Sequence, residues 1–240
     1  MLDGELLSSD MSAEERRRVK NAFAKAGLPI VDLGTSLTIA QPPSEARDRQ
    51  IREGKVFLEM AAKWEAPMIR VFGYAPEGTP QAEAIKNAID FLSQLADHAR
   101  QTGVMVVLET HDCFTSSAVV AEIMRPFPEA QFGVIWDMMN TYSAGEAIID
   151  SIRQLGSRLK HVHVKDGRPP VEPLPYWGNL LLGTGQMPLP EAVKALAASG
   201  FTGYLSMEWE KKWHPELEEP EVALPHGAAY LRRLLETLNP

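Results

Sequence analysis

The chain has 240 residues, of which 45% are hydrophobic and 23% are charged, and its formal net charge is -8. This composition is ordinary for a water-soluble globular protein, and the acidic balance disfavours general nucleic-acid binding. No apolar run approaches the roughly 18 residues of a membrane span, the N-terminus lacks a signal-peptide pattern, and the single cysteine, Cys113, can form no internal disulfide. We therefore expect a cytoplasmic protein with no membrane or nucleic-acid partner.

Apolar segments of strand length alternate with amphipathic segments of helix length along the chain. The first helix has a capping-box pattern, with Ser12 at the N-cap and Glu15 three residues later, and Gly27 is placed to end it. Helices are expected at Ser12–Lys25, Ser44–Trp64, Pro80–Thr102, Ser116–Met124, Ala147–Leu155, Pro190–Ser199 and Leu224–Leu238. Strands are expected at Leu28–Leu33, Met68–Phe72, Val104–Leu108, Phe132–Trp136, Leu159–Val164 and Gly203–Met207.

This alternation predicts an α/β protein, specifically a TIM (β/α)8-type barrel formed by one domain over residues 1–240. Six strands are clear, and Leu2–Leu7 is a candidate for a seventh, so the first βα unit of the barrel has no counterpart. An incomplete barrel leaves a strand edge that needs cover, and a homodimer would supply it. The one long irregular stretch, Gly167–Pro188, is expected to be a functional loop.

Four candidate metal ligands each fall at the C-terminal end of a predicted strand: Glu109, Asp137, His163 and Glu208. In a parallel barrel these strand ends converge on one rim, where active sites are built. Carboxylates and an imidazole without a thiolate favour one divalent cation, with Mn²⁺ as the leading candidate and Mg²⁺, Co²⁺ or Zn²⁺ as alternatives.

Such a site suits a sugar in which two neighbouring oxygens chelate the ion. The ion then acidifies the C–H between them and stabilises the resulting enediolate. Glu109 and Glu208 are candidates for the groups that remove and return the proton, in addition to binding the ion. The predicted activity is therefore that of a metal-dependent sugar, or sugar-phosphate, isomerase or epimerase.

Several segments resemble the xylose isomerase-like TIM-barrel family, which contains sugar and sugar-phosphate isomerases and epimerases. The similarity is carried by IRVFGY, VVLETH, LKHVHVKD and LLGTGQMPLPEAVKALAASGFTGYLSMEWE. The resemblance implies that Glu109, Asp137, His163 and Glu208 bind the metal and that the two glutamates exchange the substrate proton. It also implies a substrate-binding arginine after the histidine strand, for which Arg168 is the nearest match, offset by one residue.

Further candidates for substrate contact each have a second interpretation. His161 is expected to support the site through a hydrogen bond, with metal binding as the alternative, and Lys165 either binds substrate or pairs with Asp166. Arg70 either binds a substrate oxyanion or forms a salt bridge with a carboxylate. Trp136 and Trp177 are candidates for pocket walls, and Trp136 is alternatively a residue of the core. The glycine pair at residues 183–185 resembles a phosphate-cradling turn and is equally a simple tight turn.

Position 140 departs from the pattern of ketose 3-epimerases, which carry histidine three residues after the metal aspartate. Here that position is Asn140, a substitute candidate for substrate contact. The same asparagine, together with Trp177 and Asn179 at two other ligand positions, argues against the trinuclear zinc site of the apurinic-site endonucleases. An inosose dehydratase-like lyase, which shares the first proton abstraction, and a non-catalytic sugar- or metal-binding barrel stay open as alternatives.

Overall fold

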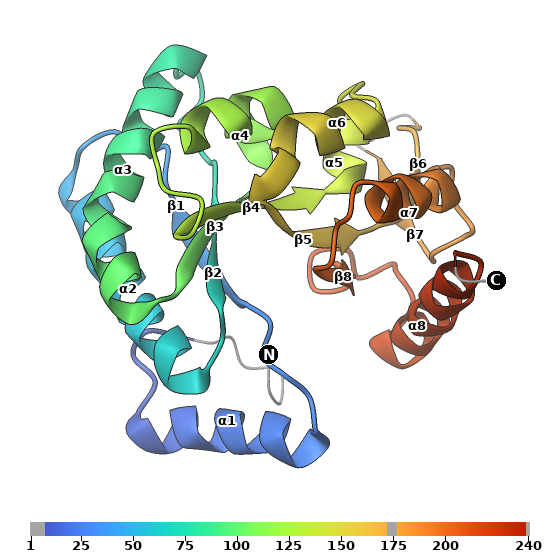
Figure 1. Cartoon of the computed structure of the whole chain (residues 1–240), viewed down its shortest axis with the longest axis horizontal. Helices are drawn as coiled ribbons and strands as arrows, with labels where there is room; N and C mark the ends of the chain where they lie inside the picture. The colour runs from blue at the N-terminus through green and yellow to red at the C-terminus, as the bar shows by residue number, and fades with distance from the viewer. Residues whose placement is uncertain (1–7, 172–176, 239–240) are drawn as a thin grey trace. The chain divides into compact units, whose positions relative to one another are not determined.

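A computed structural model describes residues 8–171 and 177–238. Within them, six strands form a parallel sheet in the order β1-β2-β3-β4-β5-β8, so the strand order follows the chain (Figure 1). These strands are β1 (Leu33–Thr38), β2 (Met68–Phe72), β3 (Met105–Glu109), β4 (Phe132–Asp137), β5 (Leu159–Val164) and β8 (Tyr204–Met207). The α/β class and five of the six predicted strands are confirmed, whereas Leu2–Leu7 lies outside the described residues.

Eight α-helices lie in the described part of the chain, and most follow a strand. They are α1 (Ala13–Ala26), α2 (Glu45–Trp64), α3 (Gln81–Thr102), α4 (Ser117–Met124), α5 (Met138–Ser143), α6 (Ile148–Leu155), α7 (Leu189–Ala198) and α8 (Pro220–Glu236). Short 3₁₀ helices lie between β3 and α4, η1 (Asp112–Phe114), and between α6 and β5, η2 (Gly156–Arg158). Every helix among the described residues is too short or too polar to span a lipid bilayer.

Contacts divide the chain into two compact units. The first unit comprises the described residues up to Cys113 together with Glu122–Gly133. The second unit comprises Phe114–Ala121 and the described residues from Val134 onward. The first unit therefore carries β1, β2 and β3, and the second unit carries β4 from Val134 onward, β5 and β8.

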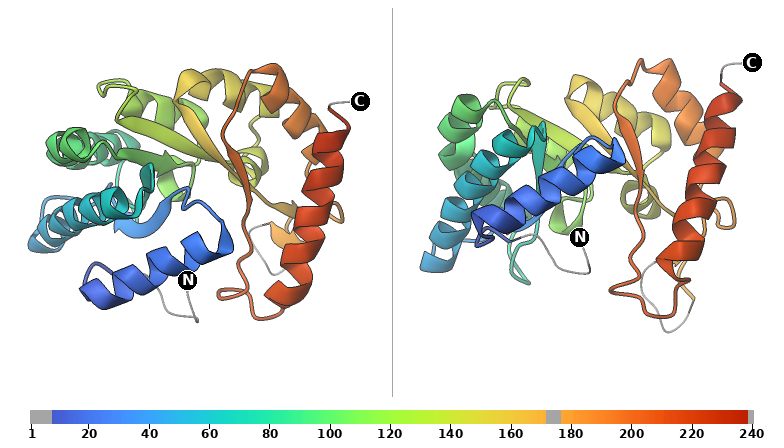
Figure 2. Two further views of the ribbon diagram at one scale, coloured as in Figure 1. Left: turned by 60° about the horizontal axis from the view of Figure 1, so that its bottom comes forward. Right: turned by 90° about the horizontal axis from the view of Figure 1, so that it is seen from below.

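In the first unit, the parallel strands are covered by the long helices α2 and α3, which lie side by side (Figure 2). The β1–β2 register pairs Leu33 with Ile69, and the β2–β3 register pairs Ile69 with Val106. Phe91 on α3 and Leu58 on α2 are fully buried. Burial of these apolar side chains is the main force that holds helices on a sheet.

Both ends of α1 match the sequence prediction. The Ser12 hydroxyl accepts a hydrogen bond from the Glu15 amide at 3.2 Å, and the Glu15 carboxylate accepts one from the Ser12 amide at 2.7 Å. Gly27 ends the helix in a left-handed conformation with φ 66°. The capping box and the glycine stop are therefore confirmed.

The predicted strand Leu28–Leu33 is placed wrongly, because β1 begins only at Leu33. The amide of Leu28 donates to the Phe23 carbonyl at 3.1 Å, so this part of the apolar run closes α1 instead of pairing with β2. Leu28 is also 60% exposed. Within β1 the alternation is regular, since Leu33, Thr35 and Leu37 are buried.

In the second unit, β5 lies between β4 and β8, and the registers pair Asp137 with His163 and His163 with Ser206. The predicted loop Gly167–Pro188 contains an antiparallel hairpin of two short strands, β6 (Asp166–Arg168) and β7 (Gly178–Leu180). Helix α5 has no counterpart in the prediction. Helix α8 begins four residues before the predicted start at Leu224.

We expect Gly27→Ala to destabilise the protein by about 1 kcal/mol, because an L-residue with a side chain is strained in the left-handed region. A Cβ at Gly27 would meet no other atom within 4 Å, so the loss would come from the backbone alone. Gly178→Ala is the matched control, since its surroundings are equally open and its φ is not positive. Urea denaturation followed by circular dichroism measures both, and equal loss in the two variants would contradict this account.

Candidate metal centre

Three of the four predicted ligands come together in the second unit. Asp137 is the last residue of β4, His163 lies one residue from the end of β5, and Glu208 directly follows β8. Because these parallel strands are in register, their ends lie at one level, and ligand atoms of the three side chains lie within 4.8 Å of one another. Asp137 is fully buried and His163 is 8% exposed. The second unit thus contains a buried acidic and histidine cluster.

Asp137 is fixed by the helix that follows it. Its Oδ1 accepts a hydrogen bond from the Asn140 amide at 2.9 Å, which caps the N-terminus of α5. Its Oδ2 lies 2.9 Å from the Lys165 ammonium nitrogen. The backbone of Asn140 therefore orients one of the candidate ligands, and the predicted contact of its side chain with substrate stays a prediction.

Lys165 lies among three carboxylates and is 3% exposed. Its Nζ is 2.9 Å from Asp137 Oδ2, from Glu208 Oε2 and from Glu210 Oε1. Burial by itself would lower the pKa of Lys165, but the charges of these three carboxylates outweigh it and hold the pKa well above the ordinary value. The three carboxylates therefore favour the charged form of the lysine, and they are its carboxylate partners.

Glu208 is held in its ionised form. Burial favours the neutral acid and would raise its pKa, but a hydrogen bond from His163 and the charge of Lys165 lower the pKa far below the ordinary value. His163 Nδ1 lies 3.1 Å from Glu208 Oε2. An ionised carboxylate beside an imidazole is the form in which both groups bind a cation.

His161 lies behind the cluster on the same face of β5. It is fully buried, its Nε2 is 2.8 Å from the Ser206 hydroxyl on β8, and its ring meets the His163 ring edge-on at 5.5 Å between centroids. This is the hydrogen-bonded supporting position expected for His161. Its predicted contact with substrate is untested.

Glu210 is a member of the cluster that was not predicted from the sequence. Besides Lys165, it contacts Asn179 of β7, whose Nδ2 donates to Oε2 at 3.0 Å, and His214, whose Nε2 lies 3.5 Å from the same oxygen. The Glu-Trp-Glu spacing at the end of β8 contained the signal, because residues two apart in an extended chain point to the same side.

Asp166, next to Lys165, organises the long loop of the second unit. Its carboxylate accepts hydrogen bonds from four backbone amides, at distances of 2.8 to 3.1 Å, and these belong to Gly167, Gly183, Gly185 and Met187. The interpretation of Lys165 as a partner of Asp166 is therefore wrong. Lys165 contacts side-chain carboxylates, whereas Asp166 accepts hydrogen bonds from backbone amides. Because Asp166 already takes the amides of Gly183 and Gly185, the phosphate-cradling interpretation gives way to that of a tight turn.

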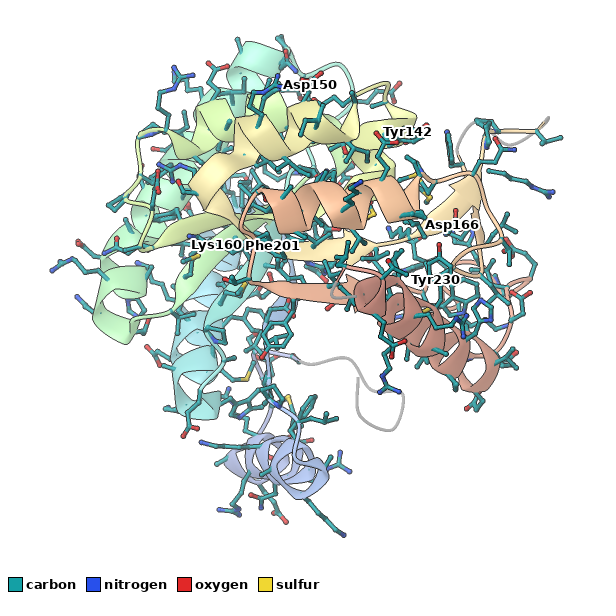
Figure 3. All side chains as sticks on the ribbon, turned by 45° about the vertical axis from the view of Figure 1, so that its right-hand side comes forward. Tyr142, Asp150, Lys160, Asp166, Phe201 and Tyr230 are labelled. Atoms are coloured by element: carbon teal, nitrogen blue, oxygen red, sulfur yellow. The ribbon has the colours of Figure 1, made fainter. Side chains whose placement is uncertain are left out.

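Both glycines of this turn are required by close contacts. A Cβ at Gly185 would lie 2.2 Å from Asp166 Oδ1, and a Cβ at Gly183, where φ is 85°, would lie 2.3 Å from the Tyr230 ring of α8. Figure 3 shows Asp166 and Tyr230 in this region. The turn is therefore packed against α8 as well as bound to Asp166.

The remaining substrate candidates of the second unit lie in and near the hairpin. Arg168 is exposed on β6. Trp177 is partly buried and meets the Tyr142 ring edge-on at 5.8 Å between centroids. Trp136 is fully buried and its indole N–H donates to Thr141 at 2.8 Å, so the prediction that it lines a pocket is wrong. It lies on the opposite face of β4 from Asp137.

Glu109, the fourth predicted ligand, belongs to the first unit, where it is the fully buried last residue of β3. Arg70 Nη1 lies 3.0 Å from Glu109 Oε2, and Arg70 Nη2 donates to the Thr35 carbonyl at 3.3 Å. The guanidinium carbon also lies 4.0 Å from the centre of the Phe72 ring. Arg70 thus forms the salt bridge that was one of its two interpretations, and it compensates the charge of Glu109.

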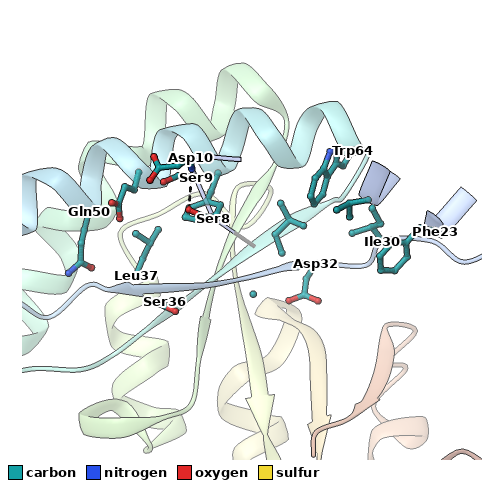
Figure 4. Close-up of a pocket in the computed structure, with 15 residues that line it drawn as sticks. Ser8, Ser9, Asp10, Phe23, Ile30, Asp32, Ser36, Leu37, Gln50 and Trp64 are labelled. Carbon is teal, nitrogen blue, oxygen red and sulfur yellow. Dashed lines mark hydrogen bonds between the residues drawn. The ribbon is translucent and has the colours of Figure 1, made fainter. Parts of the chain in front are cut away.

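A cavity of about 700 Å³ lies in the first unit (Figure 4). Apolar side chains such as Phe23, Leu37 and Trp64 line it, together with the acidic Asp32 and Glu53. Neither Arg70 nor Glu109 is among its lining residues. Gly34, which does line it, lies next to the Arg70 guanidinium, since a Cβ at Gly34 would be 3.3 Å from an Arg70 Nη atom.

Comparison with known proteins now identifies the family. A family model described as "Xylose isomerase-like TIM barrel" matches residues 2–234. The chain belongs to the xylose isomerase-like TIM-barrel family. Fructoselysine 3-epimerase of Escherichia coli O157:H7 is 26% identical over 151 residues, which cover 60% of this chain and 51% of that protein. The chain thus spans about half the length of this curated relative.

Solved structures of other proteins share the fold. A D-tagatose 3-epimerase-like protein superimposes with a TM-score of 0.79 at 19% identity, over 95% of this chain and 85% of that one. The IOLI protein, solved with a bound zinc atom, gives a TM-score of 0.80 at 18% identity, over 95% and 83% of the two chains. The fold predicted from the sequence is therefore confirmed.

The donors in the second unit fit the divalent cation that the xylose isomerase-like resemblance implies. Two carboxylates and an imidazole, without a thiolate, suit Mn²⁺, Mg²⁺, Co²⁺ and Zn²⁺, so the donor set leaves the identity of the metal open. The three carboxylates near Lys165 also exceed its single positive charge by two. A divalent cation would neutralise this excess.

We expect Asp166→Ala to destabilise the protein by about 3 kcal/mol or more, because it removes the acceptor of four amides, three of them in one turn. Asp166→Asn keeps one acceptor oxygen and is expected to lose less. Asp150→Ala is the control, since this residue pairs with Arg153 at the surface of α6 and such pairs contribute little. Urea denaturation gives the stabilities. Limited proteolysis between residues 177 and 188 reports on the turn, and no increase in cleavage for Asp166→Ala would contradict the account.

Proposed function

We propose that this chain is a divalent-metal-dependent sugar isomerase or epimerase. The observation that carries the proposal is the buried cluster of Asp137, His163 and Glu208 in the second unit, with ligand atoms within 4.8 Å of one another. The family match and the epimerase among the relatives support the same reaction class. A bound divalent cation would make the C–H between two neighbouring sugar oxygens acidic.

Asp137, His163 and Glu208 would hold this cation, and we propose Glu109 as the fourth ligand. Its support is its place at the C-terminal end of β3, the strand that precedes β4 in the sheet order, and its complete burial. A buried carboxylate requires compensating positive charge. Arg70 supplies part of it, at 3.0 Å.

We assign the removal and return of the substrate proton to the two glutamates. The contacts of Glu208 with His163 and Lys165 both involve Oε2, so Oε1 is the oxygen that would address the substrate. Two carboxylates that address opposite faces of a sugar permit epimerisation, and one carboxylate alone would suffice for isomerisation.

Substrate contacts are proposed from the sequence and from the position of each residue in its own unit. Arg168 is exposed at the end of β6, and its guanidinium makes it the best candidate for binding a hydroxyl or carboxylate of the substrate. The other proposed contacts are His161, Lys165, Arg70, Asn140 and Trp177. A homodimer and a cytoplasmic location stay proposals that rest on the sequence.

We expect the activity to depend on a divalent cation and on Glu208. A panel of D-tagatose, D-psicose, D-fructose, L-ribulose, fructoselysine and inosose should contain a substrate, and chelation followed by dialysis should abolish its turnover until Mn²⁺ is added back. Product chromatography separates epimerisation, isomerisation and dehydration, and incorporation of deuterium from D₂O reports proton exchange at carbon.

Glu208→Gln should lower kcat about 10²- to 10⁴-fold, the usual contribution of a positioned acid or base. Glu216→Gln, which alters a side chain that is 70% exposed, is the control and should retain activity. Full activity in the Glu208 variant, or full activity after complete removal of metal, would refute the mechanism.

We expect Arg168→Ala to raise KM for the identified substrate about tenfold with little change in kcat, because a contact made equally in the ground and transition states affects binding alone. Arg153→Ala, at an exposed position on α6, is the control. Steady-state kinetics measure both variants. An unchanged KM would remove Arg168 from the site.

A further inference from the structure

Lys165 makes contacts that a substrate-binding residue does not need. Its ammonium contacts two proposed metal ligands through Asp137 Oδ2 and Glu208 Oε2, each at 2.9 Å. Asp137 Oδ1 is already used by the Asn140 amide, and Glu208 Oε2 is also the oxygen that contacts His163. The ammonium therefore takes one oxygen of each of these two carboxylates, oxygens that a bound metal ion would also need.

Electrostatics makes the ammonium and a divalent cation competitors for these oxygens. Like charges repel strongly at contact distance in a site from which water is excluded, and Lys165 is 3% exposed. Both cations cannot bind the same two carboxylate oxygens without a shift of the lysine. The side chain can shift, since a lysine carries its charge on a flexible four-carbon stem.

Glu210 supplies a second position for the ammonium. Its Oε1 lies 2.9 Å from Lys165 Nζ, and it is not one of the proposed ligands. Its Oε2 is held from the other side by Asn179 at 3.0 Å and His214 at 3.5 Å. Glu210 is thus anchored independently of Asp137 and Glu208, and it would keep a charge partner beside Lys165 after those two carboxylates have bound a metal ion.

We propose that Lys165 is a built-in counterion that competes with the divalent cation for Asp137 and Glu208, and that Glu210 retains the lysine when the cation enters. This inference rests on the proposed metal site. It has two consequences. The cluster keeps its geometry without metal, because the lysine prevents repulsion among the carboxylates. The affinity for metal is also set below the value that the ligands alone would give.

The test measures Mn²⁺ binding to the full chain by isothermal titration calorimetry, with thermal unfolding with and without Mn²⁺ as a second readout. Lys165→Met should raise Mn²⁺ affinity at least tenfold and should lower the melting temperature of the metal-free protein. Lys165→Arg keeps the charge and should not gain affinity. Lys211→Met is the matched control, because that lysine pairs with Glu219, and its affinity should equal that of the wild type.

Glu210→Gln should weaken Mn²⁺ binding about fivefold, because the displaced lysine loses its acceptor. In the Lys165→Met background the same Glu210 substitution should have no effect. This double-mutant cycle separates the proposal from general damage to the fold, since only a functional link between the two residues makes the second substitution silent. If Lys165→Met does not fold, Lys165→Gln takes its place in the cycle.

The outcomes separate this inference from the proposed function. Wild-type protein that binds Mn²⁺, with Lys165→Met binding equally or more weakly, would overturn the counterion role and leave the metal site intact. No binding by any variant would overturn both. Tight Mn²⁺ binding by Lys165→Met alone would support competition between the lysine and the metal ion. Additive effects of the Lys165 and Glu210 substitutions would show that Glu210 does not act through the lysine.

Discussion

The contacts of Lys165 with Asp137, Glu208 and Glu210 are the interaction on which the second unit depends. One buried and two largely buried carboxylates cannot lie this close together without compensation, because removing a charge from water costs much more than most single contacts contribute. The ammonium lies 2.9 Å from all three and is itself almost completely buried. It allows the ends of β4 and β8 to carry acidic groups beside His163 of β5, which is the prerequisite for a metal centre there.

The adjacent residue, Asp166, has a different task. Its carboxylate is used by four backbone amides, and it fixes the turn that follows the β6–β7 hairpin. That hairpin carries Asn179, which in turn holds Glu210. The adjacent residues Lys165 and Asp166 therefore link the cluster to its surrounding loop. Lys165 binds the acidic side chains, and Asp166 holds the backbone of the loop that carries Asn179.

The first unit shows the same principle with a single pair. Glu109 is fully buried, and Arg70 on the neighbouring strand compensates its charge while stacking on Phe72. In both units, then, a strand ends in a buried carboxylate and an inward-facing cation lies beside it. Family membership accounts for the fold, and these charge pairs explain how that fold keeps acidic side chains at its strand ends.

Local patterns in the sequence determined the α/β class, five of the six strand positions and the capping of α1 by Ser12 and Glu15, because hydrophobic periodicity and capping act over a few residues. The same patterns identified Asp137, His163 and Glu208 as strand-end groups. The tertiary structure decided which charged side chains pair and which backbone amides Asp166 binds. Glu210 lies 45 residues from Lys165 in the chain, and Asp166 binds amides up to 21 residues away. Such pairings follow from strand register and loop packing, which bring distant segments together and leave no periodic signal in the sequence.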